Sequence, residues 1–164
     1  MNNIILASKS EVRRKILEEN GIKCKVLPSN VDEDFVKNSL LKEKITPEII
    51  SKNLAELKAN KISQKEPNNI VLGADSIIDL NGQIISKPSS REEALKILKK
   101  LNGKTHNLIS SVCMSKNGSM IWNFTDKAAL TMKKMSDKEI VDYLKKIKDE
   151  SLYAYNVYQI EGEG

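Results

Sequence analysis

The stretch LASKSEVRRKIL, residues 6–17, brings hydroxyl and guanidinium groups together where an apolar run passes into a helical pattern. Ser10 can cap the predicted helix, whose first turn then offers unpaired N–H groups and a partial positive charge. With Ser8 and with Arg13 or Arg14, this helix start would form an anion site, for which phosphate is the natural occupant. The alternative is that Ser10 only caps the helix and that the arginines form a solvated face. The segment alone leaves both interpretations open.

Acidic and basic side chains that could act on a phosphate follow at separate places along the chain. Carboxylates are the ligands that Mg²⁺ prefers, and separated cations neutralise phosphate oxygens as charge develops on them. The combination fits hydrolysis of a phosphoanhydride, although spacing does not establish that the groups converge, and an aspartate after a strand is as often a turn former. The residues are Asp32 and Glu33 in an expected loop, Lys58 in a predicted helix, Asp75 after a buried strand and Lys87 after a hairpin.

Composition restricts the class of protein. The chain has 164 residues, is 40% hydrophobic and carries a formal charge of +5, which suits one domain and an anionic small ligand. Aromatic residues make up only 4% of the chain and alternate with no basic run, which argues against nucleic acid. Two distant cysteines, one histidine and no long apolar run predict a cytoplasmic protein with no membrane contact and no structural zinc site.

Alternating strand and helix patterns predict a mixed-sheet α/β domain with hairpins. The last segment, from residue 151, reads as extended and punctuated by glycine. We expect strands at 3–7, 22–27 and 69–75, a hairpin turning at Asn81-Gly82 and two long strands within 105–132, with helices starting at Ser10, Thr46, Ser90 and Ser136.

Seven motifs, in one order along nearly the whole chain, resemble the Maf family of nucleoside triphosphate pyrophosphatases. They are LASKSEVRRKIL, DE at 32–33, LAELKA at 54–59, LGADSII at 72–78, SKP at 86–88, ALKILKKLNGKTH at 94–106 and YQIEGEG at 158–164. The resemblance implies a single α/β domain over residues 1–164, with a mixed, elongated, Maf/ITPase-like central sheet flanked by helices. It also implies a homodimer, because family members commonly form dimers.

The resemblance implies cleavage between the α and β phosphates of a nucleotide, with Mg²⁺ or Mn²⁺, releasing a nucleoside monophosphate and pyrophosphate. We expect Asp75 to orient or deprotonate the attacking water, Glu33 to help hold the metal with Asp75, and the cations to neutralise the triphosphate. The implied catalytic residues are Glu33, Lys58, Asp75 and Lys87, and the implied substrate-binding residues are Ser8, Ser10, Arg13 and Glu161.

The chain also departs from the family pattern. Glu11 and Val12 stand where the first motif usually has proline and arginine, and Asn156 stands where the family usually has glycine. Val12 and Glu161 are more like the branch that prefers 7-methyl-GTP than the branch that takes dTTP and UTP. The family continues beyond the segment that ends at Gly164, so we expect a shortened C-terminus.

Three functions compete at this stage. The first is a metal-dependent pyrophosphatase that removes modified nucleotides such as 7-methyl-GTP from the nucleotide pool, with a dTTP- or UTP-preferring enzyme as the alternative. The second is a non-catalytic nucleotide-binding regulator of septum formation, and a weaker third is a basic nucleic-acid-binding protein. Carboxylates facing an anionic ligand favour hydrolysis, because a pure anion binder gains nothing from them except through a metal.

Overall fold

The structure is a computed structural model and describes residues 4–159. The described part contains strands and helices in mixed order along the chain. The strands are β1 (Ile4–Leu6), β2 (Cys24–Val26), β3 (Ile70–Leu80), β4 (Gln83–Ile85), β5 (Thr105–Lys116) and β6 (Ser119–Thr131). The helices are α1 (Glu11–Glu19), α2 (Glu33–Lys42), α3 (Pro47–Ser63), α4 (Arg91–Leu101), α5 (Asp137–Lys146) and α6 (Asp149–Tyr155).

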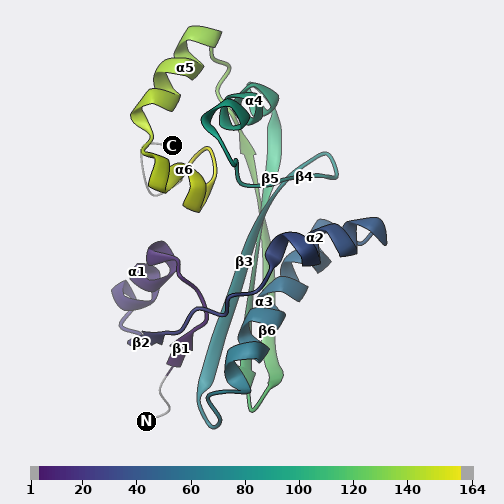
Figure 1. The fold of residues 1–164 in the computed structure, drawn as a ribbon, viewed down its shortest axis with the longest axis vertical. Coiled ribbons are helices and arrows are strands. Elements are labelled where there is room, and N and C mark those ends of the chain that lie inside the picture. The colour runs from purple at the N-terminus through teal and green to yellow at the C-terminus, as the bar shows by residue number, and fades with distance from the viewer. Residues whose placement is uncertain (1–3, 160–164) are drawn as a thin grey trace. The chain divides into compact units, whose positions relative to one another are not determined.

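All of the described strands belong to one mixed sheet with the order β2-β1-β3-β5-β6, and β4 pairs with β3 (Figure 1). β1 runs parallel to both β2 and β3, with Ile4 opposite Cys24 on one side and Ile70 on the other. β3 and β4 are antiparallel and turn at Asn81 and Gly82, whose φ angles of 54° and 83° are those of a tight hairpin turn. The predicted α/β class with a mixed sheet flanked by helices is confirmed.

The chain divides into two compact units, and β3, β5 and β6 contribute residues to both. Among the described residues, unit 1 comprises 4–77 and 109–127, and unit 2 comprises 78–108 and 128–159. The assignment of residues 1–164 to a single domain stays a prediction. Among the helices of the described part, none has both the length and the apolar character that crossing a membrane requires.

In unit 1, α3 lies against β3 and supplies much of the core. A Cβ on Gly73 of β3 would collide with the backbone of Ala55 and Ala59 in α3, so only glycine allows the helix to approach the strand this closely. Buried alanines at both of these helix positions complete the close contact. The core of this unit consists of Ile5, Ala7, Ala55, Ala59, Ile62, Val71 and Cys113.

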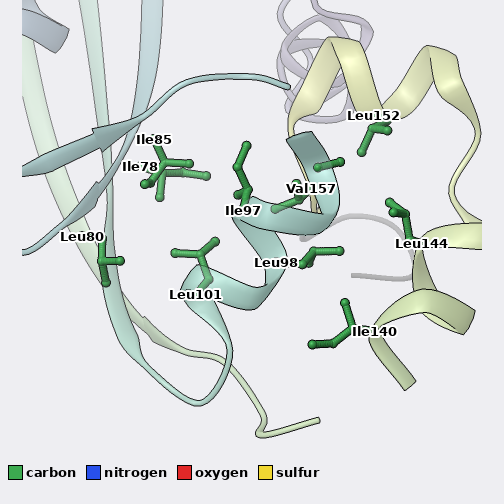
Figure 2. Packing of buried hydrophobic residues seen from close by; sticks show 11 residues of the cluster. Ile78, Leu80, Ile85, Ile97, Leu98, Leu101, Ile140, Leu144, Leu152 and Val157 are labelled. Atoms are coloured by element: carbon green, nitrogen blue, oxygen red, sulfur yellow. The ribbon is translucent and has the colours of Figure 1, made fainter. Parts of the chain in front are cut away.

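In unit 2, α4, α5 and α6 surround a second apolar core with the β3–β4 hairpin (Figure 2). The Arg91 guanidinium donates to the carbonyls of Leu144 and Ile147 at 2.9 and 2.7 Å and pairs with Asp149. It therefore joins the start of α4 to the end of α5 and the start of α6. The buried core residues are Ile78, Leu80, Ile85, Ala94, Ile97, Leu98, Leu101, Ile140, Leu144, Leu152 and Val157.

Three local predictions are wrong. The expected loop at Asp32 and Glu33 is the start of α2, because the Asp32 side chain accepts a hydrogen bond from the Phe35 N–H and caps the helix. The strand expected to end at Asp75 continues as β3 through Leu80. The segment expected to be extended contains α6, which begins at Asp149.

Candidate functional site

The turn from β1 into α1 is built as the sequence predicts. The Ser10 hydroxyl accepts a hydrogen bond from the Arg13 N–H at 3.3 Å and caps α1. The Ser8 hydroxyl accepts from the Ser10 N–H at 3.2 Å and from Arg13 Nη1 at 3.1 Å. Ser10 thus has the capping role that the simpler interpretation gave it, and its contact with substrate stays a prediction.

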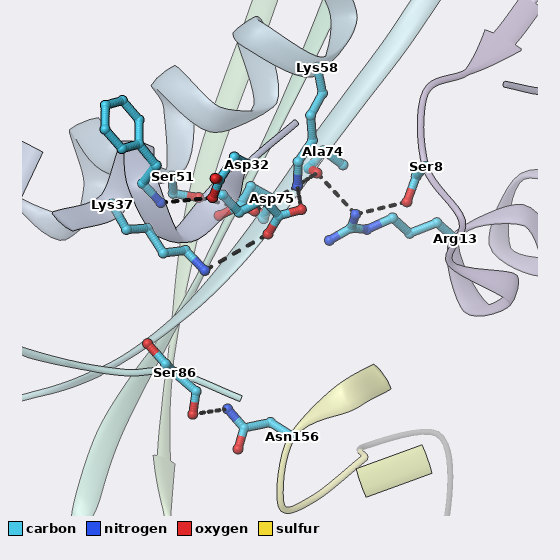
Figure 3. Close-up of polar contacts among 12 residues, drawn as sticks. Ser8, Arg13, Asp32, Lys37, Ser51, Lys58, Ala74, Asp75, Ser86 and Asn156 are labelled. Atoms are coloured by element: carbon cyan, nitrogen blue, oxygen red, sulfur yellow. Dashed lines mark hydrogen bonds and ion pairs between the residues drawn. The ribbon is translucent and has the colours of Figure 1, made fainter. Parts of the chain in front are cut away.

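The two arginines of the motif have different surroundings. Arg13 Nη1 also donates to the Ala74 carbonyl of β3 at 3.0 Å, which turns its guanidinium from α1 toward the neighbour of Asp75 (Figure 3). Arg14 instead pairs with Glu11 and Glu18 on the exposed face of its own helix, at 2.8 and 3.1 Å. Of the two alternatives left open by the sequence, Arg13 is therefore the arginine placed at the site.

Lys58 is the centre of a partly buried ionic cluster. Its side chain projects from α3, and the residue is 5% exposed. Nζ lies 2.9 Å from Asp75 Oδ1 and 2.8 Å from Glu33 Oε1, and it donates to the Ala74 carbonyl at 3.3 Å (Figure 3). Arg13 and Lys58 thus share one carbonyl acceptor, while Lys58 joins two carboxylates from α2 and β3. These four side chains therefore converge in unit 1, which spacing in the sequence did not establish.

Each member of the cluster is held by a different local cause. Glu33 is fixed because Asp32 caps α2 and places the next residue in the first turn of the helix. Lys58 is fixed because the contact at Gly73 presses the middle of α3 onto β3. Asp75 follows Gly73 by two residues, so the two side-chain positions lie on the same face of the strand and toward α3. The site therefore depends on how closely the helix packs on the sheet.

The electrostatics of Asp75 follow from its burial. Asp75 is 3% exposed, and burial raises the pKa of its carboxyl, while the positive charges of Lys58 and Lys37 lower it and Glu33 raises it. Oδ1 is bound to Lys58, whereas the buried Oδ2 has no hydrogen-bond partner among residues 4–159. A buried carboxylate oxygen without a donor is positioned to accept a proton or a metal ion.

The cluster fits a divalent cation. Mg²⁺ is commonly held by one or two carboxylates, with substrate phosphates and water completing the coordination. Glu33 and Asp75 supply two carboxylates within reach of one Lys58 ammonium, and Asp75 Oδ2 is an unused oxygen ligand. Within the described residues no group of three or more acidic, histidine or cysteine side chains is placed so that it could hold a metal ion.

Two of the predicted residues lie outside the described part of unit 1. Lys87 belongs to unit 2, in the segment between β4 and α4, and its side chain is exposed. Glu161 lies outside the described residues. Their roles toward substrate stay predictions.

Sequence reasoning missed two polar residues beside the cluster. The buried Ser51 hydroxyl of α3 donates to the Asp75 carbonyl at 3.2 Å, and its spacing of seven residues from Lys58 put it on the same helix face. Lys37 of α2 lies 3.9 Å from Glu33 Oε2, with a side chain only 14% exposed. Its place could be predicted only after α2 was known to be a helix, because the contact joins residues four apart.

The chain is similar in sequence to named proteins and in fold to solved structures. A nucleoside triphosphate pyrophosphatase of Pelagibacter ubique is 74% identical over 164 residues, which cover 100% of this chain and 84% of that protein. A 7-methyl-GTP pyrophosphatase of Brucella abortus is 35% identical over 161 residues, covering 98% of this chain and 81% of that protein. The solved structure of a HAM1 protein from Coxiella burnetii has 16% identity and a TM-score of 0.47, over 79% of this chain and 71% of that chain. The sequence pattern of the family described as Maf-like protein matches residues 3–164, and the chain therefore belongs to the Maf family.

Proposed function

We propose that this protein hydrolyses nucleoside triphosphates between the α and β phosphates, releasing a nucleoside monophosphate and pyrophosphate. Support comes from membership of the Maf family and from relatives named as nucleoside triphosphate pyrophosphatases. The observation that carries the proposal is the partly buried cluster in which Lys58 joins Glu33 and Asp75 beside Arg13. A protein that only binds nucleotides would gain nothing from two carboxylates in this place except through a metal.

Asp75 is the proposed general base. Its burial raises the pKa of the carboxyl, which makes the carboxylate a stronger proton acceptor than an exposed aspartate. Oδ1 is held by Lys58, and Oδ2 is free of other donors in the described part of the chain. In the proposed step Oδ2 takes a proton from the attacking water, and the oxygen of that water forms the new bond to the α phosphorus while pyrophosphate leaves.

The cations of the site neutralise the polyphosphate. Arg13 and Lys58 present positive charge on either side of the Ala74 carbonyl, and such fixed charges stabilise the oxygens on which negative charge develops. Ser8 holds the Arg13 guanidinium by a hydrogen bond of 3.1 Å and keeps it directed toward β3. Lys87 is proposed as a third cation and Glu161 as a contact to the nucleotide.

A divalent cation, Mg²⁺ or Mn²⁺, is part of the proposal, with Glu33 and Asp75 as its protein ligands. The cation would supply Lewis-acid polarisation of a phosphoryl oxygen and would lower the pKa of a bound water. Lys58 keeps the two carboxylates together before metal and substrate arrive.

Among substrates we favour 7-methyl-GTP, with dTTP and UTP as the alternative. The preference is supported by Val12, by Glu161 and by the Brucella abortus relative named for that nucleotide. We also propose a cytoplasmic setting, which the free thiols of Cys24 and Cys113 in the described chain support. A homodimer, and the expectation that neither nucleic acid nor membrane is a partner, stay predictions.

The test is release of pyrophosphate and monophosphate from 7-methyl-GTP, dTTP, UTP and CTP, each with Mg²⁺ or Mn²⁺. We expect turnover with at least one of these nucleotides and the highest kcat/KM with 7-methyl-GTP. A folded protein that binds nucleotides and hydrolyses none of them would contradict the proposed activity and favour the regulator of septum formation.

A further inference from the structure

Asn156 adopts a backbone conformation that residues other than glycine rarely adopt. It ends α6 with φ 77° and ψ −163°, and the residue is only 7% exposed. A non-glycine residue in this region is held there by its surroundings at a cost in backbone strain. Such a residue must therefore provide an interaction that glycine could not.

The side chain of Asn156 makes two interactions of that kind, one local and one with a distant segment. Its N–H donates to the Leu152 carbonyl at 3.1 Å, which glycine would preserve, and its Oδ1 accepts from the adjacent Val157 N–H at 2.9 Å. Nδ2 donates to the Ser86 carbonyl at 3.2 Å, in a segment 70 residues away in sequence (Figure 3). Only the side chain can form this bond, which fastens the end of α6 to the end of β4.

The Ser86 carbonyl that Asn156 binds belongs to the residue immediately before Lys87. On the other side of the lysine, Pro88 is buried and restricts Lys87 to an extended backbone. Next to it, the Ser89 N–H and hydroxyl both donate to Glu93 Oε2, at 2.7 and 2.6 Å. The backbone of Lys87 is thus fixed on its C-terminal side by Pro88 and α4, and on its N-terminal side by Asn156.

We propose that Asn156 is a positioning residue that holds the backbone at Lys87 so that its ammonium group meets the triphosphate in one place. The inference rests on the proposed function, in which Lys87 neutralises the substrate. Displacing a binding group by about 1 Å can cost about 100-fold in rate. Without the bond to Ser86, Lys87 keeps its charge but loses part of its fixed position.

The test compares Asn156→Gly with Asn81→Gly. Asn81 is an exposed residue with φ 54° in the β3–β4 turn of the same unit, so glycine relieves a positive φ at both sites. In Asn156→Gly we expect an unchanged or raised Tm, faster amide exchange at Ser86 and Lys87, and a fall of about 10-fold in kcat/KM for the triphosphate. In Asn81→Gly we also expect an unchanged or raised Tm, but amide exchange at Lys87 and kcat/KM should stay as in the wild type.

A double-mutant cycle with Lys87→Met separates positioning from a merely structural role. If Asn156 acts through Lys87, adding Asn156→Gly to Lys87→Met costs no further activity. Additive losses, a marked fall in Tm for Asn156→Gly, or unchanged kcat/KM in that variant of an active enzyme would each overturn the inference. If the wild type hydrolyses no nucleotide, the proposed function fails, whereas unchanged amide exchange in Asn156→Gly contradicts the fastening of Lys87 whatever the activity.

Discussion

At the scale of single residues, Lys58 both compensates the charge of neighbouring carboxylates in the folded protein and belongs to the proposed catalytic site. Its ammonium group is the shared partner of two carboxylates in a buried place, where an unpaired charge is expensive. A buried ion pair gives little net stability compared with apolar packing, so its presence is better explained by the chemistry of the site. Removing Lys58 should nevertheless destabilise the fold, because the charge of Asp75 then stays buried without its partner.

We expect Lys58→Met to lower the free energy of unfolding by about 3 kcal/mol near neutral pH and to abolish turnover. Burial raises the pKa of Asp75, so in the variant the folded protein takes up a proton there at higher pH than the unfolded chain. Stability therefore falls as pH rises through the window between the unfolded and folded pKa values of Asp75. In urea unfolding with EDTA present, the loss in free energy of unfolding of Lys58→Met relative to the wild type should be smaller at about pH 5 than at about pH 8. The exposed Lys65→Met is the control, and an equal deficit at both pH values would refute this explanation.

His106 provides a second residue-level prediction, in unit 2. Its Nε2 lies 2.7 Å from the Tyr158 hydroxyl, its Nδ1 has no partner in the described chain, and burial lowers the pKa of the imidazole. As the pH falls, the unfolded chain therefore takes up a proton at His106 at a higher pH than the folded protein does. The free energy of unfolding then decreases as the pH falls below about 6.5. Urea titrations between about pH 7 and pH 5 should show a weaker loss in His106→Gln than in the wild type. Equal pH dependence in both proteins would exclude His106 as the cause.

At the scale of elements, the contact between α3 and β3 places the cluster. Gly73 is the point of closest approach, and a methyl group there meets backbone atoms of Ala55 and Ala59, which cannot move aside as a flexible side chain could. The position of Lys58 over Asp75 thus depends on the absence of a side chain two residues before the aspartate.

Gly73→Ala should therefore lower both stability and turnover. We expect a loss of about 2–4 kcal/mol in the free energy of unfolding and a fall of at least about 10-fold in kcat, because α3 moves away from β3 with Lys58. The control is Gly21→Ala, where φ is +77° and nothing lies within 4 Å of the added Cβ. Backbone strain should cost that variant about 1 kcal/mol without changing kcat. Equal activity of both variants would contradict the role given to the helix–strand contact.

The elements that the sequence predicted well carry explicit capping or turn residues. α3 begins at Thr46-Pro47 as predicted, although the Thr46 side chain makes no capping hydrogen bond. The Ser136 and Glu139 side chains form a capping box at the predicted start of α5, and Asn81-Gly82 forms the predicted turn. For α4, Ser90 caps the Glu93 N–H as predicted, but the Glu93 carboxylate binds Ser89 instead of closing the box.

The elements that were missed either lack a clear capping or turn residue or begin at a polar residue that is also common in loops. α2 has no fully buried residue, so its apolar spacing is weak, and its capping aspartate read as part of an acidic loop. The strand was expected to end at Asp75, yet the aspartate lies within β3, and Gly73 two residues before it serves the contact with α3. Five residues of the candidate site were predicted from the family motifs, since no hydrophobic periodicity could have identified them. The structure brings these five together: Ser8, Arg13, Glu33, Lys58 and Asp75.

At the scale of the whole molecule, the described chain places its ionic cluster in one unit and Lys87 in the other. Unit 1 holds Glu33 and Asp75 with Lys58 and Arg13, so its carboxylates are balanced by cations from the protein itself. The fold should therefore not need a metal to neutralise the site, although the proposed reaction needs one.

Metal removal tests this separation of folding from catalysis. We expect EDTA to abolish nucleotide hydrolysis, and Mg²⁺ or Mn²⁺ to restore it, while the circular dichroism spectrum and Tm change little because Lys58 already pairs with both carboxylates. Full turnover in EDTA would contradict the metal-dependent reaction, and unfolding in EDTA would contradict the charge balance within the cluster.

The most direct test of the central claim is hydrolysis of a nucleoside triphosphate by the wild type and by Asp75→Asn, followed by phosphorus NMR. Asparagine keeps the shape of the side chain but is a poor base, and the control Asp79→Asn changes the other aspartate of β3, which binds the Gly82 N–H. The account predicts monophosphate and pyrophosphate from the wild type and Asp79→Asn, with turnover at least about 100-fold lower in folded Asp75→Asn. Wild-type turnover in Asp75→Asn would contradict it.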